Sequence, residues 1–175
     1  MNAWNNWINQ NPALFGVGFA VVFVLMWLGV TLLLPSLSGW SRLMVEFPDR
    51  PEEPPLLQLR WQSGRLGTFG KAGIWNILTL TGGGVGMRNI LTLSVCHCGL
   101  RIGIMRLFGL FCSDFLVPWN AISVTRKETL SGPAATLEFG QPSIGYLTIA
   151  ARIADQLARA ATTRWPQAGL IPKES

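Results

Sequence analysis

The chain has 175 residues, of which 49% are hydrophobic and 13% are charged, and its formal net charge at pH 7 is +5. No run of Lys or Arg supplies the basic footprint that nucleic acid requires, so we do not expect a nucleic-acid partner. The three cysteines, Cys96, Cys98 and Cys112, are an odd number, which favours free thiols over a disulfide framework.

Residues 13–34 form an apolar run of 22 residues without a charge, which ends at Pro35. As a helix this run would be about 33 Å long, enough to cross the hydrocarbon core of a bilayer. Residues 1–12 lack the Lys or Arg that opens a secretory signal peptide, and no small-residue cleavage site follows the run. The sequence therefore predicts an uncleaved transmembrane helix over 13–34, after a short extracytoplasmic segment over 1–12.

Basic residues near the predicted span indicate its orientation. Arg42 and Arg50 follow the span, whereas no Lys or Arg precedes it. Because cytoplasmic flanks carry the excess of basic residues, we expect a single-pass protein of the bacterial inner membrane with its C-terminal domain in the cytoplasm. Trp4, Trp7 and Trp40 flank the span and are predicted to be interfacial anchors. Packing of Trp4 and Trp7 on a partner protein is the alternative.

Small residues near the start of the span predict a face for helix packing. Gly16 and Ala20 are four residues apart, a small-xxx-small pair that allows two helices to approach closely. The span contains no ionisable residue, so it lacks the groups that an ion path would need. We expect the helix to anchor the chain and to contact other membrane subunits.

Residues 35–56 are predicted to be an interfacial helix followed by a spacer. Apolar residues recur at approximately helical spacing, which suits a helix lying on the membrane surface: Leu37, Trp40, Leu43, Met44 and Phe47. Four prolines over 48–55 would then make a stiff, Pro-rich linker.

Residues 57–165 are predicted to form one α+β domain, with a tail over 166–175. Alternating patterns predict strands over 57–62, 74–81, 91–96, 100–105, 115–125 and 135–139. Residues 64–73 and 82–86 are expected to be glycine-rich turns. An amphipathic pattern predicts a helix over 147–163 that caps a bent antiparallel sheet or barrel. A second membrane span over 90–118 is disfavoured because it would bury Arg101, Arg106 and Asp114 in the bilayer.

Several short motifs resemble one protein family. They are LSGWSRL at 37–43, RWQSGRLG at 60–67, the turn at Gly99 and Leu100, and LVPWNAI at 116–122 with Pro118, Trp119 and Ile122. Together they resemble a group of uncharacterised bacterial single-span membrane proteins. The resemblance implies a pleckstrin-homology-like cytoplasmic domain, in which these residues serve the fold. The group carries no established catalytic residues, so it implies none here.

No catalytic, cofactor or metal site is expected. Cys96, His97 and Cys98 form a tempting triplet, but a zinc site needs four ligands and no second pair follows. His97 with Ser113 or Asp114 lacks the surroundings of a nucleophile, so hydrolysis is not expected. Residues 64–73 fail the phosphate-loop pattern at Arg65 and Ala72.

Two interpretations of function follow. In the first, the chain is a non-catalytic accessory subunit that stabilises a larger membrane complex, of photosynthetic or respiratory type, through its helix and its domain. Eight Trp and eleven Arg suit this role, because interfaces are enriched in both. In the second, the chain is a membrane-tethered module that binds anionic lipid, a peptide or a soluble protein. The expected partners are other membrane subunits and lipid headgroups; an enzyme acting on a small molecule is not expected.

Overall fold

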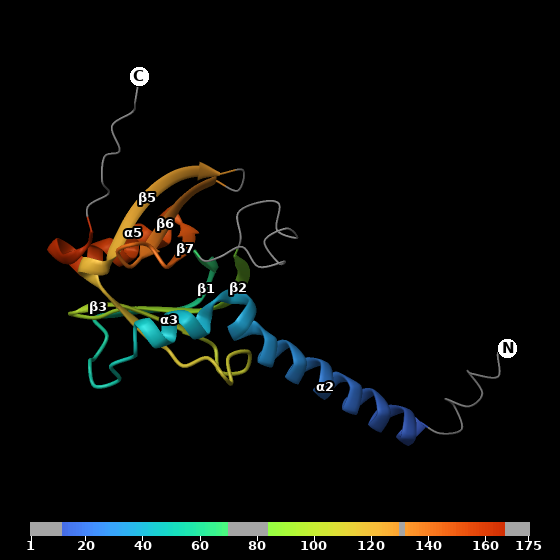
Figure 1. Cartoon of the computed structure of the whole chain (residues 1–175). Coiled ribbons are helices and arrows are strands. Elements are labelled where there is room, and N and C mark those ends of the chain that lie inside the picture. Colours follow the sequence, from blue (N-terminus) through green and yellow to red (C-terminus); the bar gives the residue numbers. More distant parts are fainter. Residues whose placement is uncertain (1–11, 70–83, 130–131, 167–175) are drawn as a thin grey trace.

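The computed structural model describes residues 12–69, 84–129 and 132–166, and they form a long helix attached to a β-rich domain (Figure 1). The helices are α2 (Pro12–Ser38), α3 (Trp40–Glu46) and α5 (Ala151–Ala161), with short 3-10 turns η1 (Trp119–Ala121) and η2 (Thr162–Arg164). The strands are β1 (Leu57–Thr68), β2 (Val85–Val95), β3 (Gly99–Ile104), β4 (Phe115–Pro118), β5 (Ile122–Thr129), β6 (Gly132–Phe139) and β7 (Gly145–Ala150). The chain is therefore α+β, as its patterns predict. We call residues 40–166 the head.

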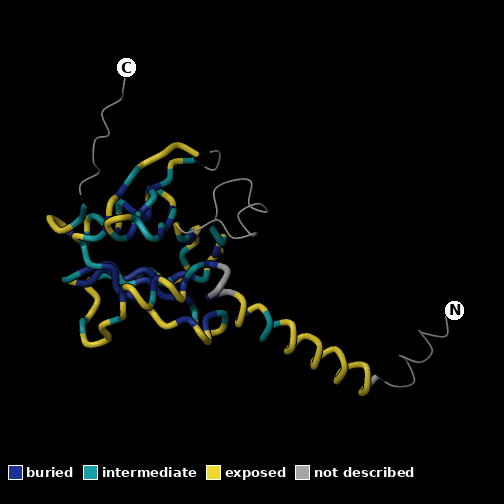
Figure 2. The backbone as a smooth tube through the Cα atoms, viewed as in Figure 1, coloured by how far each residue is buried: buried dark blue, intermediate teal, exposed yellow. Residues whose placement is uncertain are grey.

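The segment Ala13–Leu33 of α2 is long and apolar enough to cross a membrane. Its side chains are exposed along most of its length (Figure 2). The helix continues through Pro35 to Ser38, rather than ending at the proline. It ends where Gly39 adopts a left-handed conformation with φ of 72°.

The seven strands form one antiparallel sheet in the order β4-β3-β2-β1-β7-β6-β5. Strands β4 and β5 lie at opposite edges of this order, yet only the three residues of η1 connect them. So short a connection brings the two edges close together, which curls the sheet into a half-barrel (Figure 1). Helix α5 packs on this sheet through Ile153, Ala154, Leu157 and Ala161, all of which are buried.

Several predicted elements differ from the structure. The strand predicted over 91–96 is longer, because β2 begins at Val85 within the predicted turn over 82–86. The glycine-rich turn over 64–73 is wrong for 64–68, since β1 continues there and pairs with both β2 and β7. The strand over 115–125 is two strands, because Pro118 ends β4 and η1 follows. The helix over 147–163 begins only at Ala151, because residues 147–150 complete β7. The strand predicted over 74–81 lies outside the described residues.

Helix α3 belongs to the core of the head, which corrects the prediction of an interfacial helix over 35–56. Trp40 and Leu43 are fully buried. The Trp40 ring lies edge-on to Phe115 of β4 at a centroid distance of 4.9 Å, and its Nε1 donates a hydrogen bond to the Ser113 carbonyl at 2.8 Å. Trp40 is therefore a core residue and not an anchor in the headgroup layer, because the open side of the curled sheet supplies a better apolar environment.

The junction between α2 and α3 is a single glycine held against the sheet. A Cβ on Gly39 would overlap the side chain of Thr68 at the end of β1, and the positive φ adds strain for any other residue. The next turn is closed by bonds from the amides of Arg42 and Leu43 to the Gly39 carbonyl. The described chain therefore passes from α2 into the core of the head without a flexible spacer.

The Pro-rich segment over 48–55 lies on the head rather than extending away from it. Asp49 pairs with Arg101 of β3, with Oδ1 to Nε at 2.7 Å. Glu53 accepts a hydrogen bond from the Cys98 amide at 2.7 Å, and its second oxygen contacts the Cys98 thiol. Although desolvation opposes the shift, the bonds from Cys98 and the charge of His97 hold the pKa of Glu53 below its ordinary value. The predicted linker is thus a strap across the end of β3.

Candidate functional site

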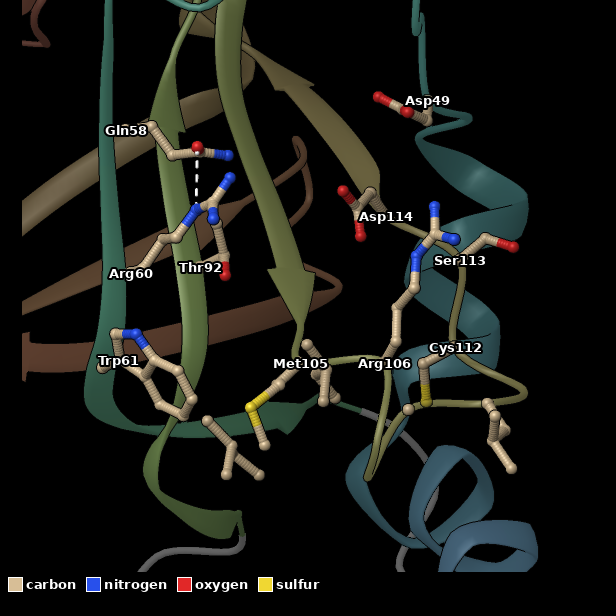
Figure 3. Close-up of a pocket in the computed structure, with 14 residues that line it drawn as sticks. Asp49, Gln58, Arg60, Trp61, Thr92, Met105, Arg106, Cys112, Ser113 and Asp114 are labelled. Atoms are coloured by element: carbon tan, nitrogen blue, oxygen red, sulfur yellow. Dashed lines mark hydrogen bonds between the residues drawn. The ribbon is translucent and has the colours of Figure 1, made fainter.

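A groove of about 860 Å³ lies on the outer face of β1, β2 and β3 (Figure 3). The loop between β3 and β4, residues 105–114, forms one wall, and Asp49 lies at the upper end. The groove is lined by Asp49, Gln58, Arg60, Trp61, Ile90, Thr92, Ile104, Met105, Arg106, Gly109, Leu110, Cys112, Ser113 and Asp114. We call it the polar groove.

A bulge in β1 places an aromatic side chain in the polar groove. The pairing of β1 with β2 is irregular between Leu59 and Gln62, and Trp61 has a φ of 60°. Bulges of this kind turn side chains away from the face that simple alternation predicts. Trp61 is consequently 63% exposed. Simple alternation along 57–62 would instead place it on the same face as Leu57 and Leu59, which face the core.

The partner strand stabilises the bulge. Asn89 of β2 also has a positive φ, of 54°. Its amide donates to the Ser63 hydroxyl at 3.0 Å, and that hydroxyl donates in turn to the Asn89 Oδ1 at 2.8 Å. Asparagine tolerates this backbone conformation better than most residues. The bulge is therefore held by side-chain bonds on both strands.

The charges in the polar groove are mixed. Arg60 donates from Nε to the Gln58 Oε1 at 3.0 Å (Figure 3), and Arg106 lies on the loop wall. Asp114 lies over Gly103, where a Cβ would collide with its carboxylate. Loss of hydration, together with the charge of Asp49, raises the pKa of Asp114 above its ordinary value. Two guanidinium groups and two carboxylates therefore line the polar groove.

The residues that line the polar groove offer no reactive thiol and no imidazole. Its thiol, Cys112, is buried, and burial raises its pKa to about 11. A thiol with so high a pKa is almost entirely protonated at neutral pH and is a poor nucleophile. Histidine is absent from the lining residues.

The residues considered for metal or hydrolytic chemistry lie apart. His97 and Cys98 precede Gly99, which pairs with Pro118 at the far end of β4, whereas Ser113 and Asp114 precede the start of that strand. The His97 Nδ1 lies 3.3 Å from an Arg164 nitrogen. In the part of the chain that the structure describes, no three His, Cys, Asp or Glu side chains are placed to hold a metal ion.

The motif residues occupy the seam between β3, β4 and η1. Gly99 allows the close approach of the β4 backbone, since a Cβ there would overlap the Val117 carbonyl. Leu100 and Ile122 are buried, and Pro118 ends β4. Trp119 is half-buried; its Nε1 donates to the Cys96 carbonyl at 3.3 Å, and its ring lies 5.9 Å from that of Trp165.

The predicted membrane contacts lie away from the groove. Gly16 and Ala20 are on the exposed surface of α2, and nothing lies within 4 Å of a Cβ built on Gly16. Trp4 and Trp7 are outside the described residues.

Sequence patterns gave no indication of the polar groove. The patterns place Arg60 and Trp61 on a strand and in the RWQSGRLG motif, and Arg106 enters only as a charge that disfavours a second span, because nothing in a period-two pattern marks the bulge. The one signal in the sequence is the asparagine at position 89. Asparagine is enriched among residues with a positive φ, which is the conformation that Asn89 has in the structure.

A scan of protein-family models and searches of curated proteins and solved structures found no match to this chain.

Proposed function

We propose that this chain is a membrane-anchored, non-catalytic accessory subunit that holds a rigid head against a larger complex in the bacterial inner membrane. In this proposal α2 spans the bilayer and contacts neighbouring helices, and the head is pleckstrin-homology-like and cytoplasmic. The curled antiparallel sheet followed by α5 supports that fold assignment.

The observation that carries the proposal is the junction at Gly39. A module that searches for ligands gains from a flexible tether, whereas a subunit that braces an assembly gains from a fixed one. Here α2 runs into α3 through one residue, and the buried Trp40 fixes α3 in the head. The position of the head is therefore set by the position of α2, which is what a bracing role requires.

Copurification tests the proposal. We expect the full chain, extracted in mild detergent from its native membrane, to bring down membrane subunits in fixed stoichiometry. Gly16→Leu should weaken this association, because a bulky side chain blocks close helix approach. The matched control is Leu14→Ile, a change of shape without a change of size at another exposed position of α2. Recovery of wild type as a monomer would contradict the proposal.

The cytoplasmic placement of the head has its own test. A fluorescent protein fused after Ser175 should be fluorescent, and alkaline phosphatase fused at the same place should be inactive. An active phosphatase fusion would contradict the proposed orientation and indicate the opposite one.

The polar groove favours a second candidate, a membrane-tethered module that binds a lipid headgroup. Trp61, Arg60 and Arg106 offer an aromatic ring and two guanidinium groups on one surface. Proteoliposomes with and without anionic lipid distinguish the two candidates. Protection of β1 around Arg60 and of the loop around Arg106 from hydrogen exchange only with anionic lipid would favour the binding module.

A further inference from the structure

The loop between β3 and β4 exposes an unusual amount of apolar surface for a charged, water-facing domain. Leu107 is 56% exposed, Leu110 is 53% exposed and Phe111 is 52% exposed. Three large apolar side chains are thus exposed within five residues, and exposed apolar groups gathered in one place often mark a contact surface. We call these three residues the loop tip.

Backbone hydrogen bonds order the loop between β3 and β4. The Met105 amide donates to the Ile90 carbonyl at 2.8 Å, which fixes the start of the loop to β2. Successive turns follow, with the amides of Phe108 and Gly109 donating to the Met105 carbonyl and the Cys112 amide donating to the Gly109 carbonyl. Gly109 packs on Ile104, where a Cβ would lie 2.9 Å from its Cγ2. These bonds hold the loop tip outward.

The loop lies beside the end of α2. Ser113, at the base of the loop, accepts the hydrogen bond from Trp40, the second residue after α2. Figure 1 shows the loop, in yellow, extending from the sheet on the side where α2 leaves the head.

The length of α2 places the loop at the depth of the headgroups. The apolar span ends at Leu33 and the helix ends at Ser38, a rise of about 8 Å at 1.5 Å per residue. The headgroup region on each side of the hydrocarbon core is of similar thickness, about 5 to 8 Å. The head therefore begins at the outer edge of the headgroup layer, and the loop, which lies on the side where α2 leaves the head, faces the lipids.

We propose that the loop tip is a second membrane contact, in which Leu107, Leu110 and Phe111 insert among the lipids beside α2. The loop tip contacts the bilayer itself, because α2 belongs to the same chain and holds the head next to the membrane. The exposed Arg106 next to the tip suits the phosphate layer above. The inference rests on the proposed role of α2 as a membrane span, and it adds that the head is held at two points.

Photo-crosslinking of the full chain in phosphatidylcholine–phosphatidylglycerol vesicles tests the inference. The variants Leu107→p-benzoylphenylalanine and Phe111→p-benzoylphenylalanine place the reactive group on the loop tip, at exposed positions that tolerate a large side chain. The matched control is Lys127→p-benzoylphenylalanine, an exposed position on β5, on the far side of the head (Figure 1). Leu25→p-benzoylphenylalanine reports on the span itself.

We expect lipid adducts, detected by mass spectrometry, at positions 25, 107 and 111 and none at position 127. Adducts at position 25 without adducts at 107 and 111 would overturn the inference and leave the span intact. Adducts between two copies of the chain at 107 or 111 would also overturn it, in favour of a protein contact. Absence of adducts at position 25 would overturn the span and the inference together.

Discussion

Helices α2 and α3 follow each other with one glycine between them, but they differ in whether the protein buries their apolar side chains. In the most apolar window of α2 no residue is buried, whereas Trp40 and Leu43 of α3 are inaccessible to solvent. The first helix is apolar around its whole circumference, which suits a lipid environment. The second is apolar on one face, which the curled sheet covers. The extent of the apolar surface around a helix, rather than its apolar content, decides where the helix is buried.

Trp40→Ala should have the largest effect on this difference. Truncation of a large buried aromatic side chain typically costs about 3 to 5 kcal/mol of the free energy of unfolding. The alanine variant also lacks the hydrogen bond to the Ser113 carbonyl and the ring contact with Phe115. Urea denaturation of the full chain in detergent, followed by circular dichroism, measures the change.

The control for this prediction is Trp61→Ala, which removes the same side chain from a position that is 63% exposed. Surface substitutions usually change stability by about 0.5 kcal/mol or less. Equal stability of the Trp40 and Trp61 variants would mean that α3 is not part of the core.

Gly39→Ala tests the rigidity of the junction. The left-handed conformation costs an ordinary residue about 1 to 2 kcal/mol, and overpacking adds about 1 to 3 kcal/mol. We therefore expect a loss of about 2 to 5 kcal/mol, measured by the same denaturation. Gly86→Ala on β2 is the control, because nothing lies within 4 Å of its Cβ position and its φ is not in the left-handed region. A loss no greater than that of the control would indicate a loose junction.

Asp49→Ala tests whether the strap after α3 is attached to the head. The pair with Arg101 is largely shielded, with side-chain exposures of 24% and 12%. Hydrogen bonds to charged groups contribute about 1.5 to 3 kcal/mol, so a loss near the lower end is expected. The exposed pair of Arg126 and Asp155 is the control; Asp155→Ala should cost about 0.2 to 1 kcal/mol.

The acid sensitivity contributed by Glu53 should be the smallest effect. Its pKa is lower in the folded state, so its contribution to stability is present above its unfolded pKa and is lost as the pH falls through the folded value. Glu53→Gln keeps an acceptor for the Cys98 amide but removes the charge. Denaturation between pH 3 and pH 7 should show the wild type losing its advantage over this variant in acid; parallel profiles would rule out the role of Glu53.

The sequence was sufficient to predict the features that depend on composition and simple periodicity. The apolar run, the antiparallel strands and the final amphipathic helix follow from patterns of hydrophobic residues within one segment. Trp40 could not be placed in this way, because its burial depends on Phe115, 75 positions later in the chain. Trp61 was misplaced because one bulge inverts the faces of a strand. The polar groove combines both difficulties, since it needs the bulge and the distant loop at once.

The left-handed joint at Gly39 has a mechanical consequence. Membrane helices tilt by about 20° on average, and the tilt changes with bilayer thickness. A flexible hinge between α2 and the head would absorb such a change. The single residue Gly39 joins them instead, so α2 and the head are expected to tilt together. In the proposed membrane-spanning arrangement, a change in the tilt of α2 would move strands β5 and β6 relative to the lipid surface, so that local bilayer thickness would set the height of a protein surface.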